Sequence, residues 1–254
     1  MGVFDLARPL VYALDGMLDF LPPVVRLLLW AALAGLIGMA VYRWTSPQEK
    51  LQALKIKVRE DRRAMANFDG EADEMWPVLV ASLSSSLKHL GLTFGAALLA
   101  GLPVLMLISP IAQRYGPSQP EAGATIAVTA FEAEDVGWQW DTDSTPVDLR
   151  GETVSVVWPQ MGQSKALLAE GRSVLTLPLP DGSAVIHKKL WWNSLFANPA
   201  GYLASDAPVE AIKFDLPQQQ FIPFGPSWIR SWVFTFFVAL IAVSVILKIW
   251  WKIE

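Results

Sequence analysis

Polar and basic residues at two places in apolar sequence are the first candidates for chemistry in this chain. Arg26 lies about one turn inside an apolar segment, and Ser85, Lys88, His89 and Thr93 lie at the polar beginning of another. Polar groups inside a bilayer are costly, so each of them raises a functional question. Arg26 has two interpretations: a long side chain that reaches interfacial water, or a fixed positive charge in a water-filled groove.

The sequence gives little support for a metal-binding site or for covalent catalysis. His89 stands beside Lys88 at a membrane boundary, where an interfacial histidine is more common than a haem or chlorophyll ligand, and His187 is a weaker candidate still. Neither has a second ligand at metal-binding spacing, and zero cysteines exclude thiolate sites and disulfides. Asp141 and Asp143 are spaced like half of a calcium loop, but the rest of that loop is missing, so a role as turn residues is favoured. No nucleophile elbow or phosphate loop is visible. We expect no enzyme activity, cofactor or metal.

The chain contains three apolar segments, which cover 22–44, 88–111 and 227–250 and position the polar residues. Each is long enough to cross a hydrocarbon core of about 30 Å as a helix. The formal charge of −4 disfavours nucleic-acid binding. We therefore expect an α-helical membrane protein with three transmembrane helices. Small residues four positions apart predict close contacts of the first two helices at Ala31/Gly35, Ala34/Gly38, Gly91/Gly95 and Ala97/Gly101.

Basic residues predict which ends of these segments face the cytoplasm. Lys248 and Lys252 follow the third segment, whereas acidic residues dominate the region after the second. A basic cluster follows the first segment, with Arg43, Lys50, Lys55, Lys57, Arg59, Arg62 and Arg63. The bias predicts an N-terminus outside, a cytoplasmic connection over 45–87, an extracytoplasmic region over 112–226 and a cytoplasmic tail over 251–254. A bacterial inner membrane fits this plan best.

The segments outside the predicted spans have patterns of their own. Residues 1–21 form an amphipathic pattern typical of a helix in the outer interface, and packing against another membrane subunit would give the same pattern. Within 45–87, Ser46 is expected to cap a charged helix, with Glu49 completing a capping box. Asp69-Gly70 marks a turn into a second helix that can continue into the second span. This predicts a cytoplasmic helical hairpin, and a solvated coiled linker fits the same charge pattern.

The region over 112–226 changes from helical to alternating periodicity. Short apolar runs bounded by Pro, Gly and Asp indicate strands over 125–131, 136–140, 153–158, 173–179, 184–188 and 211–216. The pattern predicts an extracytoplasmic antiparallel β-domain. Its Gly137–Trp140 stretch resembles the aromatic segment of cytochrome oxidase subunit two, but that copper centre needs two cysteines, so the copper site is ruled out.

The whole plan resembles the three-span branch of the YidC/Oxa/Alb insertase superfamily. That branch includes subunit three of the endoplasmic-reticulum membrane protein complex, the transmembrane-and-coiled-coil protein and archaeal YidC-like proteins. Local similarities are Arg26, Gly38-Met39 followed by Arg43, the charged helix over 46–65, the helix that contains Met75, and Pro226-Ser227-Trp228 to Trp232. The similarity is best over 45–115 and 217–250. The β-domain departs from the branch, which has a short outer loop there.

The resemblance implies a groove, open to cytoplasm and lipid, that eases short hydrophilic segments across the bilayer. The residues that would line or gate this groove are Arg26, Ser85, Lys88, His89 and Thr93. The basic residues that would meet the ribosome or a nascent chain are Arg59, Arg62 and Arg63. The residues that would anchor the third span at the outer interface are Trp228 and Trp232.

Two other functions fit the same sequence. A structural or assembly subunit of a larger inner-membrane complex would use the small-residue faces and a tryptophan-rich β-domain for docking, since tryptophan is enriched at binding hot spots. A sensor that couples the β-domain to the hairpin would need a signalling output domain, which is not visible. The expected partners are the lipid bilayer, nascent membrane proteins or the ribosome, and membrane-protein subunits, without nucleic-acid binding by the chain itself.

Overall fold

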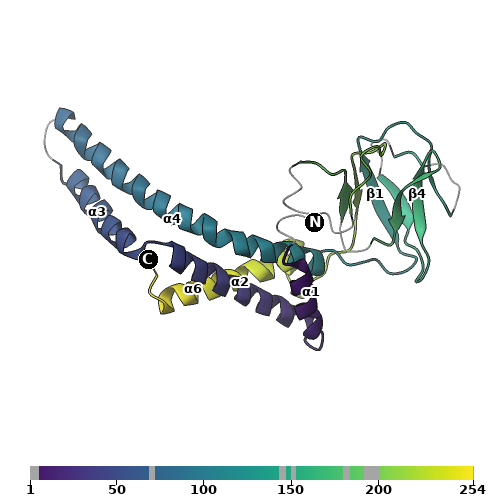
Figure 1. Cartoon of the computed structure of the whole chain (residues 1–254), viewed down its shortest axis with the longest axis horizontal. Helices are drawn as coiled ribbons and strands as arrows, with labels where there is room; N and C mark the ends of the chain where they lie inside the picture. The colour runs from purple at the N-terminus through teal and green to yellow at the C-terminus, as the bar shows by residue number, and fades with distance from the viewer. Residues whose placement is uncertain are drawn as a thin grey trace. The chain divides into compact units, whose positions relative to one another are not determined.

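The computed structural model describes residues 6–68, 72–142, 147–149, 153–179, 184–191 and 201–253 (Figure 1). The chain divides into two compact units, and each is described by itself. The first unit contains Met1–Leu27 and Met106–Thr235, and the second, called the helical unit below, contains Leu28–Leu105 and Phe236–Glu254. The turn expected at Asp69-Gly70 and the turn residue Asp143 lie outside the described residues.

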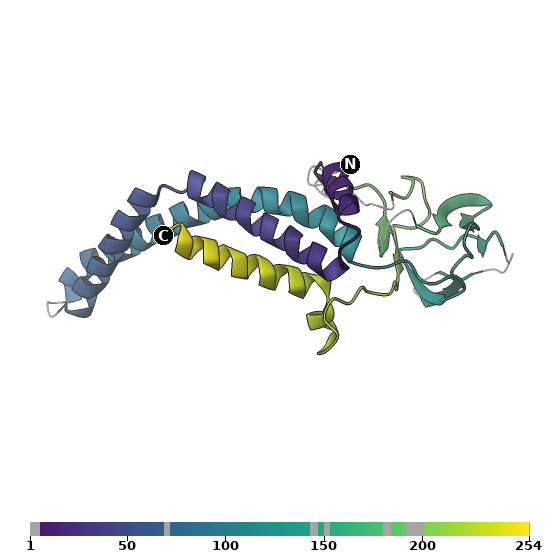
Figure 2. The same ribbon diagram turned by 90° about the horizontal axis from the view of Figure 1, so that it is seen from below.

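Among the described residues, three helices are long and apolar enough to cross a membrane. They are α2 over Pro23–Thr45, the Met75–Tyr115 part of α4 and α6 over Trp232–Trp250. Apolar runs of this length form helices because a helix satisfies every backbone amide within the segment. In the helical unit α2, α4 and α6 run side by side (Figures 1 and 2). The three expected apolar helices are confirmed, and they indicate a multi-pass membrane protein.

The small residues of α2 allow close helix packing. A Cβ placed at Gly35 would lie 3.2 Å from the carbonyl oxygen of Leu240 in α6. A Cβ placed at Gly38 would lie 3.1 Å from a methyl group of Val104 in α4, which spans Ala72–Tyr115. The residues that complete the two small pairs, Ala31 and Ala34, are fully buried. The contacts expected along this face of α2 are therefore confirmed.

The small residues of α4 do not make the expected contacts. A Cβ placed at Gly91, Gly95 or Gly101 would meet no other described part of the chain within 4 Å. The neighbouring helices pack instead on a different face of α4, where Ala96 and Ala100 are buried. The prediction of helix contact at Gly91/Gly95 and Ala97/Gly101 is therefore wrong within this chain, because the neighbouring helices pack on another side of α4.

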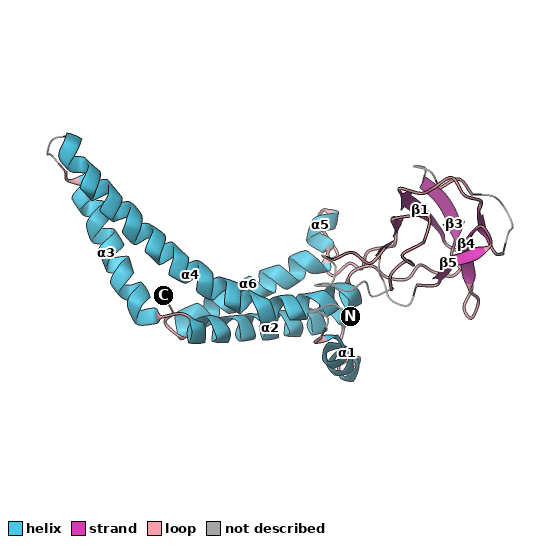
Figure 3. Ribbon diagram, turned by 45° about the horizontal axis from the view of Figure 1, so that its top comes forward, coloured by secondary structure: helices cyan, strands magenta, loops and turns pink. Residues whose placement is uncertain are grey.

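The connection between the first two apolar helices is a helical hairpin. α3 covers Gln48–Ala66 and runs beside the N-terminal half of α4 (Figure 3). The second hairpin helix and the second apolar segment are one continuous helix of 44 residues. The capping box expected at Ser46 is wrong. The Ser46 amide donates to the Tyr42 carbonyl at 2.9 Å, so Ser46 closes the last turn of α2, and α3 begins after Pro47 without a side-chain cap.

The third apolar helix begins later than the expected residue 227. Ser227–Arg230 forms the short helix α5, Ser231 is extended with φ −71° and ψ 156°, and α6 starts at Trp232. The Ser231 hydroxyl accepts a hydrogen bond from the Phe234 amide at 3.4 Å, as an N-cap residue does. An N-cap residue requires a non-helical backbone, which explains the break between the two helices.

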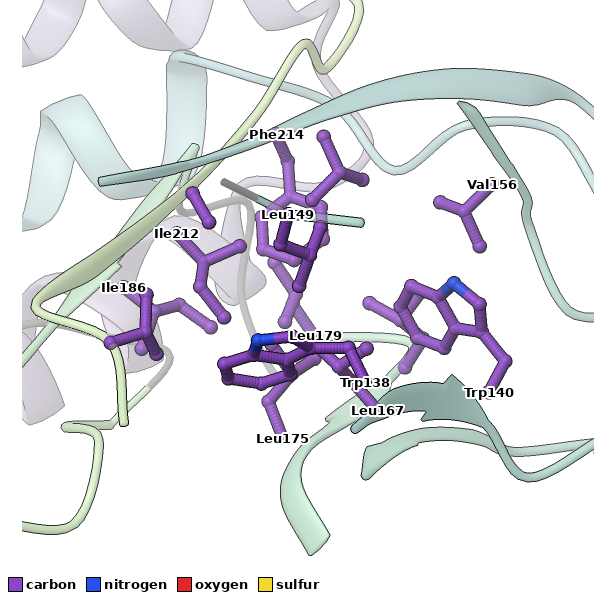
Figure 4. Packing of buried hydrophobic residues seen from close by; sticks show 14 of the residues in the cluster. Trp138, Trp140, Leu149, Val156, Leu167, Leu175, Leu179, Ile186, Ile212 and Phe214 are labelled. Atoms are coloured by element: carbon purple, nitrogen blue, oxygen red, sulfur yellow. The ribbon is translucent and has the colours of Figure 1, made fainter. Parts of the chain in front are cut away.

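The strands lie in the first unit and form two antiparallel sheets (Figure 1). The sheet of order β3-β1-β7-β6 contains Thr153–Val157, Thr125–Phe131, Ala211–Phe214 and Val185–His187. The sheet of order β2-β4-β5 contains Trp138–Trp140, Lys165–Ala169 and Arg172–Leu177. Both sheets contribute to one hydrophobic core, which includes Trp138, Trp140, Leu167, Ile212 and Phe214 (Figure 4). The expected antiparallel β-structure is confirmed.

Strand β4 is the strand that the sequence pattern missed. Its sequence, KALLA, consists of good helix formers. In the fold it lies between β2 and β5, and its alternate residues Lys165, Leu167 and Ala169 are buried. Pairing on both edges and burial of alternate side chains therefore override the local helix propensity of this segment.

Candidate functional site

Four polar residues of α4 lie on the side of this helix that faces the other helices of the helical unit. Their spacing of three or four residues places Ser82, Ser85, His89 and Thr93 along one side of the helix. Ser82 and Ser85 are buried, and His89 and Thr93 are half-buried. Lys88 is exposed and lies off this side. The structure thus brings together three of the predicted groove residues, adds Ser82, and leaves Lys88 outside the set. We call these four residues the polar face of α4.

The hydroxyl groups of the polar face have defined partners. Ser85 Oγ donates to Asp61 Oδ2 at 2.6 Å, and Ser82 O lies 3.1 Å from the same hydroxyl. Thr93 Oγ1 donates to the His89 carbonyl of its own helix at 2.9 Å. Asp61 belongs to α3, so the Ser85 bond sets which part of the charged helix lies beside α4. The sequence does not single out Asp61, because it is one of three carboxylates among the nine charged residues of α3.

The basic residues of α3 surround a hollow on the surface of the helical unit. Lys55, Arg59, Arg62 and Arg63 line it together with two small apolar residues, and its volume is about 360 Å³. The lining contains four cationic side chains and no carboxylate, so it suits an anionic group such as a phosphate or carboxylate. The structure therefore brings together the three predicted basic residues and adds Lys55.

Arg26 lies at a second polar cluster, in the first unit. It donates to Asp15 Oδ2 at 3.1 Å and also bonds Asp19. Arg114 Nε donates to the same Asp15 oxygen at 3.0 Å, and the Tyr115 hydroxyl donates to the other oxygen of Asp15. We call Asp15, Asp19, Arg26, Arg114 and Tyr115 the aspartate clamp. It joins α1, over Arg8–Met17, to the first turns of α2 and the last turn of α4.

The aspartate clamp changes the interpretation of Arg26. Its two arginines face two aspartates, so the charges balance, and the Asp15 side chain is 0% exposed. A buried carboxylate needs such partners because removal of its hydration is expensive. Arg26 is therefore neither a lone snorkelling side chain nor an isolated positive charge, as the sequence suggested. Asp15 and Asp19 lie 11 and 7 residues before Arg26, and the chain between α1 and α2 is not helical, so helical spacing does not predict these contacts.

Helix α1 presents its apolar side outward. Its buried residues are Val11 and Asp15, whereas the exposed residues between Arg8 and Met17 carry no charge. The exposed side chains include Leu10, Leu14 and Met17. Water-exposed helices show the opposite arrangement. The outward face thus suits an apolar environment, and the two interpretations from the sequence, lipid interface or another subunit, both remain predictions.

The two tryptophans expected as interface anchors have different surroundings. Trp228 is exposed and packs edge-on against Phe234, with ring centroids 5.4 Å apart. Trp232 is half-buried, and its Nε1 would lie 3.6 Å from a Cβ placed at Gly116. Trp228 therefore has an open indole surface for an interface, while Trp232 also packs within its own unit.

The β-domain contains a cavity that the sequence did not reveal. Its volume is about 340 Å³, and the charged residues among its lining are Glu134, Glu170, Arg172 and Asp206. These residues come from separate loops and strand ends, so no local spacing connects them. Within the described parts of the chain, no group of three or more His, Asp or Glu side chains is arranged to hold a metal ion.

Three comparisons place this arrangement against known proteins. No protein-family model, no curated protein and no solved structure matches the chain.

Proposed function

We propose that this protein is an insertase or intramembrane chaperone that eases short hydrophilic segments of client proteins across a bilayer. The observation that carries the proposal is the polar face of α4. This face lies on a helix that is long and apolar enough to cross a membrane, and it is turned toward the neighbouring helices rather than toward solvent. The resemblance to the three-span branch of the YidC/Oxa/Alb superfamily supports the same function.

The physical basis is the cost of moving polar groups through hydrocarbon. A charged or strongly polar group at the bilayer centre costs several kcal/mol. Hydroxyl and imidazole groups on the polar face can exchange their local partners for groups on a passing chain, since Thr93 bonds only its own helix backbone among the contacts described. The polar face thus lowers the barrier without any covalent step, cofactor or metal.

The proposed setting is a bacterial inner membrane with the N-terminus outside and the C-terminus in the cytoplasm. In that orientation the basic hollow of α3 faces the cytoplasm, where ribosomes and nascent chains approach, and the β-domain faces outward. The chain contains no cysteine, so single cysteines report topology cleanly. Ile56→Cys on α3 should react with an impermeant maleimide only in inverted vesicles, and Met161→Cys in the β-domain only in right-side-out cells. The reverse pattern would contradict the orientation.

The test of function is insertion by the purified full-length chain in liposomes. A client with a short hydrophilic tail is synthesised in a cell-free reaction, and protection of the tail from protease reports insertion. The variant His89→Leu/Thr93→Val removes polar groups from the polar face and should slow insertion about tenfold, the effect of about 1.4 kcal/mol in the barrier.

The matched control is Lys88→Leu, which removes a charge from the same helix turn but outside the polar face. It should leave insertion within about twofold of the wild-type rate. Liposomes that contain the wild-type protein but insert no faster than empty liposomes would overturn the proposal. Equal losses in both variants would exclude the polar face as the route.

A structural or assembly subunit is the second candidate, favoured by exposed apolar side chains in the first unit. Met161 is 98% exposed and Trp191 is 87% exposed. Large apolar side chains on a surface suit a partner more than water. A stoichiometric partner that survives purification in mild detergent, and that is lost with Trp191→Ser but retained with Lys189→Ser, would favour this candidate over the insertase.

A further inference from the structure

The C-terminal ends of α2 and α6 carry three exposed cations, Arg43, Lys248 and Lys252. The two helices lie side by side (Figure 2), and the Arg43 guanidinium lies 5.6 Å from the centroid of the Trp251 ring. Lys248 precedes Trp251 by three residues, which places both on one side of the helix end. This stacking therefore brings cations of two helices together. We call Arg43, Lys248 and Lys252 the cationic end of the helical unit.

Lys252 occupies a backbone position that usually requires glycine. Its φ is 52°, in the left-handed region. Its amide donates to the Ile249 carbonyl at 3.3 Å, and the Ile253 amide donates to the Lys248 carbonyl at 3.1 Å. These two bonds form the motif in which a left-handed residue, most often glycine, ends a helix. The Ile253 side chain is buried, so the turn that carries Lys252 is held by packing.

The positive charge of the cationic end is not neutralised within the described residues. None of its three members forms an ion pair there, and neither α2 nor α6 contains an Asp or Glu. Each helix C-terminus supplies about half a negative charge, so the two ends offset about one of the three positive charges. Glu49 and Lys50 in the first turn of α3 cancel each other. A surplus of about two positive charges therefore remains.

The side chains around the cationic end are apolar and exposed. Trp44 is 89% exposed, Ile249 is 73% exposed and Trp250 is 75% exposed. Tryptophan at the end of a membrane span lies at the level of the lipid headgroups. α6 has 19 residues and is about 28 Å long, which matches the thickness of a hydrocarbon core. In a bilayer that α6 spans, the cationic end thus lies at the level of the lipid phosphates.

We propose that the cationic end binds the phosphate of an anionic phospholipid. A guanidinium can donate two parallel hydrogen bonds to phosphate oxygens, and the two lysines add point charges. A lipid with net negative charge fits better than a zwitterionic lipid, because the latter carries a cation of its own. Basic clusters beside membrane helices are typical sites for anionic headgroups.

Free phosphate has the same chemistry, but the surroundings favour a lipid. Acyl chains can cover Trp44 and Ile249, whereas a soluble anion would leave both side chains in water. The inference depends neither on the proposed insertase function nor on the direction in which the chain crosses the membrane, because a phospholipid phosphate is present at both surfaces of a bilayer.

Native mass spectrometry of the full-length protein in mild detergent tests this inference. Phosphatidylglycerol and phosphatidylcholine with the same acyl chains are titrated separately, and the dissociation constant of the first bound lipid is measured. Phosphatidylglycerol should bind about tenfold more tightly, because each basic residue at the surface attracts an anionic headgroup. Arg43→Gln/Lys248→Gln/Lys252→Gln should abolish this preference.

The matched control is Lys57→Gln/Lys88→Gln/Lys213→Gln, which removes the same charge from three exposed positions outside the cationic end. At about 0.15 M salt, charges more than about 8 Å away are screened, so the control should keep the preference within about twofold. Lys248→Arg/Lys252→Arg retains the charge and should also keep the preference. Thermal unfolding checks that each variant is folded.

Three results would overturn the inference. The first is equal affinity of the wild-type protein for the two lipids, which decides the question even if a variant does not fold. The second is an equal loss in the cationic-end variant and the matched control, because overall charge would then explain the preference. The third is displacement of phosphatidylglycerol by millimolar inorganic phosphate, which would assign the site to free phosphate.

Discussion

Helices α2 and α4 have similar sequences in one respect and opposite roles in the fold. Both contain small residues at four-residue spacing and a cationic or polar group near one end. In α2 the small residues pack tightly against α6 and α4, and Arg26 is held by two aspartates. In α4 the corresponding glycines are open, and large apolar side chains are exposed beside them. The small-residue side of α2 is packed within the chain, whereas the small-residue side of α4 is exposed.

The difference teaches how to separate structural from functional polar groups in membrane helices. Arg26 is the most conspicuous charge in an apolar segment, yet it forms ion pairs with Asp15 and Asp19 of the same chain. The serine, threonine and histidine groups of α4 are less conspicuous, and two of their bonds go to backbone carbonyls of the same helix. A polar group that bonds only its own helix is easier to redirect toward a new partner than one held by a buried ion pair.

The largest expected effect comes from breaking the aspartate clamp. Asp15→Asn leaves Arg26 and Arg114 without the buried negative charge that both contact. Loss of one member of a buried ion pair costs about 3 kcal/mol or more. We expect this loss in the free energy of unfolding, measured in detergent by titration with a denaturing surfactant.

Asp19→Asn is the control for the clamp, because the Asp19 side chain is 59% exposed. Exposed ion pairs contribute about 0–1 kcal/mol. Equal effects of the two substitutions would show that burial of Asp15 is not what makes the clamp strong.

A smaller effect is expected from filling the glycine sites of the two helices. Gly35→Leu should destabilise by about 2 kcal/mol, since its Cβ already meets atoms of α6 at 3.2 Å. Gly95→Leu should change the free energy of unfolding by less than about 0.5 kcal/mol, because the site is open. Thermal unfolding of both variants measures the contrast. A severe loss for Gly95→Leu would contradict the open face of α4.

The hydrogen bond between α3 and α4 should contribute less. Ser85→Ala removes the 2.6 Å bond to Asp61 and should cost about 1.5 kcal/mol, the contribution of a hydrogen bond to a charged acceptor. Hydrogen exchange of the hairpin amides reports the change locally. A double-mutant cycle with Asp61→Asn isolates the pair, and a coupling energy near zero would show that the two side chains do not interact.

The smallest expected changes in the free energy of unfolding come from two serines at helix ends, Ser46 and Ser231. Ser46 Oγ is buried and has no hydrogen-bond partner among the described residues, so Ser46→Ala should stay within about 0.5 kcal/mol of the wild type. Ser231 caps α6 through the Phe234 amide, so Ser231→Ala should cost about 1 kcal/mol. Thermal unfolding distinguishes them, and a larger loss for Ser46→Ala would restore the capping role that the sequence suggested.

Strong periodic signals made much of the fold predictable. The apolar helices follow from runs of membrane-spanning length, and β1 was expected with its observed bounds, Thr125–Phe131, from alternating residues. Weak or conflicting local signals caused the errors. Ser46 looked like a cap because serine favours that position, but its amide bonds the Tyr42 carbonyl and closes the last turn of α2. β4 was not among the expected strands, and its residues favour helices in isolation.

The candidate site was predictable in composition but not in arrangement. Ser85, His89 and Thr93 share a side of α4 by helical spacing alone, so the sequence was sufficient to group them. Which side of α4 is buried depends on where the neighbouring helices pack, and that contact requires tertiary structure. Lys88 was therefore grouped with the polar face although it lies outside it.

The sequence by itself determined the three apolar helices, the alternation of most strands and the surplus of charge on α3, because each depends on residues close together in the chain. Only the tertiary structure decided the partners of Arg26, the burial of Asp15 and which side of α4 is exposed. Arg114 and Tyr115 reach Asp15 across 99 and 100 residues of sequence. No local pattern can encode a contact of that separation, because it depends on how whole helices pack.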